Sequence, residues 1–125
     1  MLANRDLVAF LCTTDPERAI GFFRDLLGLE LVEANPFACV FDANGTTLRV
    51  SVVSELSPRP FTVLGWTVPD LTAAAADLAE RGIEPVRFDG MDQDERGIWS
   101  TPGGDLVAWF CDPDGNLLSL TQPAG

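Results

Sequence analysis

The stretch Phe110–Gln122, FCDPDGNLLSLTQ, joins an apolar run to an alternating segment through a short polar turn. The pair Asp114-Gly115 at its centre tolerates the positive φ angles that tight hairpin turns need. After the turn, leucines alternate with hydroxyl side chains, which is the period of a half-buried strand. The stretch therefore predicts a β-hairpin, and it places Ser119 in the middle of the second strand.

A similar hairpin is predicted 70 residues earlier, in FACVFDANGTTLRVSVV at Phe37–Val53. Its turn carries Asn44-Gly45, another pair that tolerates positive φ. The two segments align without a gap, and the matched pairs are Asp42 with Asp112, Gly45 with Gly115, Leu48 with Leu118, Arg49 with Ser119 and Val50 with Leu120. The chain therefore carries an internal repeat that ends in a hairpin.

The segments before the hairpins repeat as well: VAFLCTTDPERAIGFFRDLLG at 8–28 and VLGWTVPDLTAAAADLAERG at 63–82. Each reads as a short apolar strand, then an aspartate, then a helix that a glycine closes. The helix signals are the N-caps Asp15 and Asp70, Pro16 at the first helical position, and Gly28 and Gly82 after the last turn. Each helix is followed by a predicted strand, LELVEA at 29–34 and IEPVRF at 83–88.

The repeat predicts an α+β fold in which residues 1–125 form a single domain of two tandem βαβββ modules, at about 5–54 and 60–122. The second module is longer because DGMDQDERGIWSTPGGD is inserted at 89–105. One helix covers only one face of a four-stranded sheet. Two such modules side by side are expected to form a curved mixed sheet around a cleft, which is a natural ligand site.

Composition narrows the class of protein. With 46% hydrophobic residues in 125, the chain has enough apolar side chains for a core, and no apolar run is long enough to span a bilayer. The net charge of −11 repels nucleic acid and anionic membranes, so we expect neither as a partner. The N-terminus lacks a signal-peptide pattern, and we interpret Cys12, Cys39 and Cys111 as buried thiols of a cytoplasmic protein.

Two motifs resemble those of the vicinal oxygen chelate superfamily, which contains glyoxalases, bleomycin resistance proteins and extradiol dioxygenases. They are FFRDLLGLELV at 22–32 and DPDGNLLSL at 112–120, and they stand in order inside the βαβββ duplication. The resemblance covers Val8 to Gln122. It implies the two-module fold, a small-molecule ligand and a homodimer, in which the two chains sometimes exchange modules.

The resemblance also implies a divalent metal, held in the family's enzymes by side chains on the first and last strands of both modules. Those four positions fall on Val8, Arg49, Val63 and Ser119. Aliphatic chains cannot coordinate, arginine stays protonated, and a neutral serine hydroxyl is a weak ligand. A slip of one residue brings no better ligand, and the chain has no histidine. We therefore expect no metal and no other cofactor.

Strand alternation predicts which side chains share the cleft face with these positions. The candidate ligand-binding residues are Val8, Phe10, Cys12, Arg49, Ser51, Val63, Gly65, Thr67, Trp99, Trp109, Ser119 and Thr121. Arg49 either anchors a carboxylate or phosphate or pairs with a neighbouring acid. The hydroxyls either bond a ligand or fill the sheet face, and Phe10, Trp99 and Trp109 either line the cleft or belong to the core and the inserted loop.

Three functions remain open. The first is a metal-free protein that binds a partly aromatic small molecule, such as an antibiotic or a metabolite, of mixed charge. The second is a lyase, isomerase or dioxygenase with unusual metal ligands, such as Cys12 with an acid from the insert or a partner chain, or with no metal. The third is a role in assembly or regulation, with the cleft filled by its own side chains. No catalytic residue is assigned, because without histidine Cys12 and Ser119 lack their usual activating partner.

Overall fold

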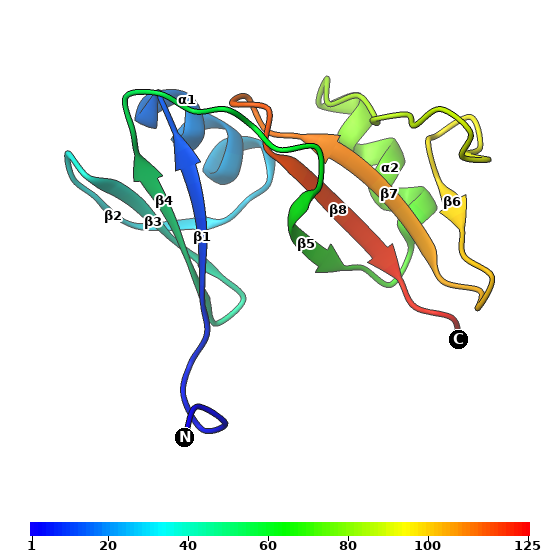
Figure 1. The fold of residues 1–125 in the computed structure, drawn as a ribbon, viewed down its shortest axis with the longest axis horizontal. Helices are drawn as coiled ribbons and strands as arrows, with labels where there is room; N and C mark the ends of the chain where they lie inside the picture. The colour runs from blue at the N-terminus through cyan, green and yellow to red at the C-terminus, as the bar shows by residue number, and fades with distance from the viewer. The chain divides into compact units, whose positions relative to one another are not determined.

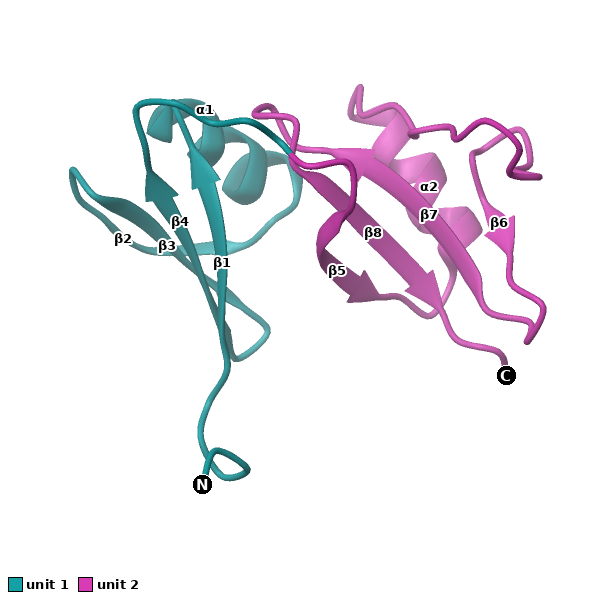
Figure 2. Ribbon diagram, viewed as in Figure 1, with its two compact units in different colours: residues 1–58 teal, residues 59–125 magenta.

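The computed structural model describes all residues, 1–125, as two compact units, Met1–Pro58 and Arg59–Gly125. Figure 2 colours the two units separately. Each unit contains a four-stranded mixed sheet with a helix on one of its faces, as Figure 1 shows. The predicted α+β class and the strand–helix–three-strand order are confirmed in both units. No helix of the structure is long and apolar enough to cross a membrane.

The first unit has its strands in the order β1-β4-β3-β2, with β1 parallel to β4 and the other neighbours antiparallel. Its elements are β1 (Val8–Thr13), α1 (Pro16–Ile20), the π-helix η1 (Gly21–Leu26), β2 (Glu30–Ala34), β3 (Ala38–Ala43) and β4 (Thr46–Val52). The predicted cap is confirmed, because the Arg18 N–H donates to the Asp15 carboxylate at 3.2 Å. Gly28 has the expected positive φ, at 81°.

The π-helix was not predicted. In it the Leu27 N–H donates to the Phe22 carbonyl at 3.0 Å, five residues back, so the last turn is wider than an α-helical one. The wide turn accompanies two adjacent buried rings, Phe22 and Phe23, packed edge to face with centroids 5.0 Å apart. Phe23 also contacts Phe41 of β3, at 5.6 Å between centroids, which fixes the helix on one face of the sheet.

The second unit has the order β5-β8-β7-β6, with β5 parallel to β8. Its elements are β5 (Thr62–Thr67), α2 (Leu71–Glu80), β6 (Trp99–Ser100), β7 (Leu106–Cys111) and β8 (Leu117–Gln122). Asp70 caps α2 by accepting from the Ala73 N–H at 3.1 Å, and Gly82 closes it with a φ of 80°, as predicted. The Leu71 N–H donates to the Gln122 side chain at 2.8 Å, which ties α2 to the end of β8.

The prediction of a strand at 83–88 is wrong, because these residues form no strand in the structure. The edge strand is instead β6, inside the insert, and only the Val86 N–H reaches β7, where it donates to the Trp109 carbonyl at 2.8 Å. Pro85 has no N–H to give to a ladder, and the Gln93 side chain occupies the backbone groups that a strand would use. Gln93 accepts from the Phe88 N–H and donates to the Val86 and Gly97 carbonyls, at 2.8, 3.0 and 2.8 Å.

The two hairpins have different turns. Asn44 and Gly45 both have positive φ, 51° and 91°, which gives the predicted two-residue turn. In the second hairpin Gly115 alone has positive φ, at 87°, and the loop has three residues, with the Asp112 N–H bonded to the Asn116 carbonyl. The prediction that Asp114 shares the positive φ is wrong, because the proline before it favours a type I turn followed by an αL glycine.

Candidate functional site

Each sheet has one face buried under its helix and one open face. In β1, Leu11 is buried, whereas Phe10 and Val8 are 61% and 44% exposed. In β4, Val50 is buried and Arg49 is half-buried. Alternation therefore separates the two faces as the sequence indicates, and the candidate residues on β1, β4, β5 and β8 stand on the open faces of their own sheets.

Phe10 and Arg49 are register neighbours on the open face of the first unit. Val8 lies opposite Thr47, Phe10 opposite Arg49 and Cys12 opposite Ser51, in the parallel pairing of β1 and β4. On its other side Arg49 is paired with Val40 of β3. The guanidinium therefore has a ring on one side and an aliphatic side chain on the other.

The alternative that Arg49 pairs with a neighbouring acid is wrong. Ion pairs join Arg24 to Asp25 and Arg81 to Asp77, whereas Arg49 forms none. The acids that the register places nearest to it, on β3 and on β2 beyond it, accept hydrogen bonds from other groups. Asp42 accepts from the Gly45 N–H at 3.0 Å, and Glu33 accepts from the Asn35 side-chain amide at 2.7 Å.

The equivalent positions on the second unit are Gly65 and Ser119. They are register partners, as are Thr67 and Thr121. A Cβ added to Gly65 would stand 2.5 Å from the Ser119 Oγ atom, so the serine side chain lies directly over the glycine. Val63, 40% exposed, falls in a register shift between Thr62 and Leu64. At these positions the face is neutral, and in place of a ring it has the Ser119 hydroxyl lying over Gly65.

Trp109 crosses the open face of the second sheet. It starts on β7 opposite Ser119, and its indole N–H donates to the Thr62 hydroxyl on β5 at 3.1 Å, so the ring passes over β8. Trp99 and Phe88 surround it, with ring centroids 6.4 and 5.1 Å away. All three rings are half-buried. Trp109 is therefore a surface residue of the sheet and no part of the core.

Sequence reasoning missed one ring of this group, Phe88, and the residue that accepts the Trp109 hydrogen bond, Thr62. The sequence predicts a strand at Phe88 that does not form, and it offers Thr62 only as a one-residue slip of the Val63 position, which is no metal ligand. The only sequence signal for this contact is a threonine, Thr62, placed one residue before the candidate residue Val63 of β5. Its partnership with Trp109 spans 47 residues of sequence and depends on the sheet register.

The residues at the metal positions do not fit the divalent ion that the resemblance implies. Val8, Arg49, Val63 and Ser119 supply one weak oxygen between them. No group of three His, Cys, Asp or Glu side chains in the structure is arranged to hold a metal ion. The Cys12 thiol has the Ser51 hydroxyl as its register neighbour on β4.

Cys39 and Cys111 offer no activated nucleophile either. The prediction that all three are buried is wrong: Cys39 is buried, Cys12 is half-buried and Cys111 is exposed. The reason is alternation, because Cys12 and Cys111 stand on open faces while Cys39 stands on the helix side. Although Cys111 is exposed, partial desolvation by its neighbours raises the pKa of its thiol, and the Asp112 carboxylate adds to the rise. Burial also raises the pKa of the Cys39 thiol. Both therefore stay protonated near neutral pH.

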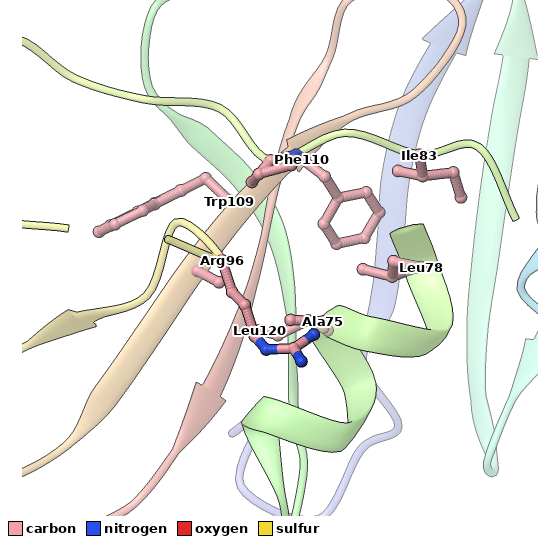
Figure 3. A pocket seen from close by; sticks show the side chains of 9 residues that line it. Ala75, Leu78, Ile83, Arg96, Trp109, Phe110 and Leu120 are labelled. Atoms are coloured by element: carbon pink, nitrogen blue, oxygen red, sulfur yellow. The ribbon is translucent and has the colours of Figure 1, made fainter. Parts of the chain in front are cut away.

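The enclosed space of the second unit is too small for an organic ligand. The cavity in Figure 3 lies between α2 and the sheet, measures about 20 Å³ and is lined mainly by apolar side chains such as Leu78, Ile83 and Phe110. That volume suits a single water molecule. A wider groove of about 390 Å³ lies beside β6, lined by Thr72, Asp92, Asp94, Ile98, Trp99, Ser100 and Leu106.

Residues 6–120 match the Glyoxalase/Bleomycin resistance protein/Dioxygenase superfamily. The chain belongs to this superfamily. Solved superfamily structures share the fold over nearly the whole chain. One, from Sphaerobacter thermophilus DSM 20745, is 22% identical, with a TM-score of 0.76 and coverage of 98% of this chain and 100% of its own. Another is a lactoylglutathione lyase from Agrobacterium tumefaciens, 17% identical, with a TM-score of 0.75 and coverage of 95% and 93%.

A third similar structure is TnmS3, an antibiotic binding protein from Streptomyces sp. CB03234. It is 26% identical to this chain, with a TM-score of 0.73 and coverage of 99% of both chains. No curated protein matches the chain. Superfamily membership thus rests on the family match, and the fold on structures that include both an enzyme and a binding protein.

Proposed function

We propose that the chain is a small-molecule-binding protein of the glyoxalase/bleomycin resistance superfamily, and that it holds a partly aromatic ligand without a metal. The observation that supports this proposal is the chemistry of four side chains. Where the superfamily's enzymes place metal ligands, this chain has Val8, Arg49, Val63 and Ser119. A scaffold that keeps its sheets and loses its ligands retains the surfaces for binding and loses the Lewis acid.

The open faces supply what such a ligand needs. The first offers apolar side chains and one cation, and the second offers hydroxyls and tryptophan rings on which a flat molecule can stack. The residues that we propose to contact the ligand are Val8, Phe10, Cys12, Arg49, Ser51, Val63, Gly65, Thr67, Trp99, Trp109, Ser119 and Thr121. The similarity to TnmS3 supports an antibiotic as the ligand class. We further propose that the protein is a cytoplasmic homodimer.

Tryptophan fluorescence tests the proposal, because two of the three tryptophans stand among the proposed contacts. The protein is titrated with a panel of aromatic antibiotics and aromatic metabolites. A binding ligand is expected to change the emission of Trp99 and Trp109. The matched control is Trp66→Phe: Trp66 stacks on Phe110 with centroids 6.4 Å apart, on the helix side of the sheet, so its loss is expected to leave the response intact. Flat emission across the whole panel would overturn the proposal.

Metal analysis of protein purified without chelator separates binding from metal catalysis. We expect less than one divalent ion per chain, and ligand affinity that is the same before and after treatment with EDTA. A stoichiometric divalent metal, or binding that EDTA abolishes, would favour a lyase, isomerase or dioxygenase with unusual ligands. Native mass spectrometry of the same sample reports the oligomer and any co-purified ligand.

A further inference from the structure

Arg49 is a cation for which the chain supplies no counter-ion. It is half-buried in the middle of β4, and it forms no ion pair with any acid of the chain. A guanidinium that is partly removed from water and faces no carboxylate keeps all five N–H donors available. Such a group is a binding site for an anion from outside the chain.

The surroundings of Arg49 determine which part of a ligand lies beside it. Phe10 is its register neighbour on β1 and is 61% exposed, so a large part of the ring is uncovered. Val8, 44% exposed, stands two residues before Phe10 on the same face. An anionic group on the guanidinium would therefore be attached to something apolar and flat that covers the phenyl ring.

We infer that the ligand is an aromatic carboxylic acid, whose carboxylate binds Arg49 through two parallel N–H···O bonds while its ring packs on Phe10. This inference rests on the proposed function and names the chemical class of its ligand. The planar guanidinium fork matches a carboxylate in shape as well as in charge.

The charge of the chain favours a monoanion over a phosphate. The net charge is −11, and the residue equivalent to Arg49 on the second sheet is the neutral Ser119. A phosphate carries up to two charges, and proteins usually meet them with several cations or a glycine-rich loop of backbone amides. Among the strand residues of the first sheet's open face Arg49 is the one cation. The register places Asp42, Glu30 and Glu33 on the same face, so a second negative charge on the ligand would have no cation to balance it.

The test uses a pair of probes of nearly equal shape, 2-naphthoate and 2-naphthamide, in which the amide lacks the charge and one of the two acceptor oxygens. Binding to the full chain is followed by the chemical shifts of the backbone amides and of the Arg49 Nε–H group. We expect naphthoate to bind about tenfold more tightly than the amide, as expected for a charge-assisted hydrogen-bonded pair at a half-exposed site. We also expect the Arg49 Nε–H signal to shift with naphthoate only.

Three variants assign the preference to Arg49. Arg49→Gln is expected to bind both probes with the affinity that the original protein has for the amide. Arg49→Lys keeps the charge and loses the fork, so it should retain only part of the preference. Arg59→Gln removes one charge from an exposed position outside the sheets and is expected to keep the full preference.

The possible outcomes distinguish a failure of this inference from a failure of the proposed function on which it rests. Equal binding of naphthoate and naphthamide overturns the carboxylate and leaves small-molecule binding in place. A preference that survives in Arg49→Gln, or that falls equally in Arg59→Gln, shows that general charge is responsible and also overturns it. If neither probe binds, the inference fails, whereas the proposed function stands or falls separately on the tryptophan titration.

Discussion

The Oγ atom of Ser119 lies over Gly65, 2.5 Å from the place where a Cβ atom on that residue would stand. The two residues face each other across the parallel pairing of β5 and β8. On the first sheet the corresponding pair is Phe10 and Arg49. The same register thus carries a ring with a cation on one sheet and a glycine with a hydroxyl on the other.

Gly65→Ala is predicted to lower the free energy of unfolding by about 1 kcal/mol, because the Ser119 side chain must leave its rotamer. Ser119→Ala should remove this penalty, so that the double variant is more stable than the sum of the single changes predicts. Urea denaturation of the four proteins measures the coupling. Gly103→Ala is the control, since a Cβ there meets no atom within 4 Å. Additive effects would contradict the packing described.

Thr62→Val is predicted to leave the Trp109 indole N–H without its acceptor. The bond lies at an exposed site where water can take the place of the hydroxyl, so the expected loss of stability is about 0.5 kcal/mol. The tryptophan emission should change as well, since the ring is released from its place across β8. Thr67→Val, on the same strand and also exposed, lacks this bond and is the control. An equal effect of the two substitutions would mean that the bond contributes nothing.

Gly45→Ala is predicted to destabilise the first hairpin by about 1–2 kcal/mol, because its φ of 91° lies in the region that L side chains avoid. Gly21→Ala is a useful contrast: its φ is −57°, a Cβ meets no neighbour there, and alanine favours the helix. We expect Gly21→Ala to be neutral or stabilising in thermal unfolding. The reverse order of the two variants would contradict the turn geometry.

Asp112 is predicted to make stability depend on pH in the direction opposite to most carboxylates. Burial raises the pKa of its carboxyl above the ordinary value of 3.8, although hydrogen bonds from Asn116 act against the rise. The folded state therefore holds the proton more tightly than the unfolded chain. The protonated carboxyl therefore contributes its whole stabilising free energy when the pH is below its pKa in the unfolded chain. That contribution is lost as the pH rises through its pKa in the folded protein.

Asp112→Asn removes that titration and keeps an oxygen for the N–H groups of Asp114 and Asn116, which donate at 3.0 and 2.9 Å. Its NH2 group, however, replaces the oxygen that accepts from the Asn116 side chain at 2.8 Å, so only the change of the difference with pH is diagnostic. Urea unfolding of both proteins from acid to neutral pH measures the difference. We expect the variant to gain stability relative to the original protein as the pH rises from about 4. A difference that stays constant, or changes in the other direction, would contradict the raised pKa.

Local features of the fold could be predicted from the sequence because their causes are local. Asp15 and Asp70 cap helices through bonds to a residue three positions on, and Asn44-Gly45 dictates its own turn. Alternation in β1 and β4 assigned residues to faces for the same reason. The π-helix was not predictable in this way, because its wider turn depends on how Phe22 and Phe23 pack against distant residues.

The parts of the site that escaped prediction depend on partners far away in sequence. The bond from Trp109 to Thr62 needs the register of two other strands, and the position of β6 depends on a side chain, Gln93, acting in place of a backbone ladder. The lack of an acid at Arg49 is of the same kind. It follows from where Asp42 and Glu33 make their bonds, which composition does not contain.

The divided edge of the second sheet has a consequence for solubility. The outer side of β7 pairs with a strand of only two residues at one end and with the single N–H of Val86 at the other. A long, continuous edge would present a row of free amides and carbonyls to which another chain can add a strand, and short or interrupted edges oppose such growth. The same insert that displaces the predicted strand thereby protects this side of the sheet against aggregation.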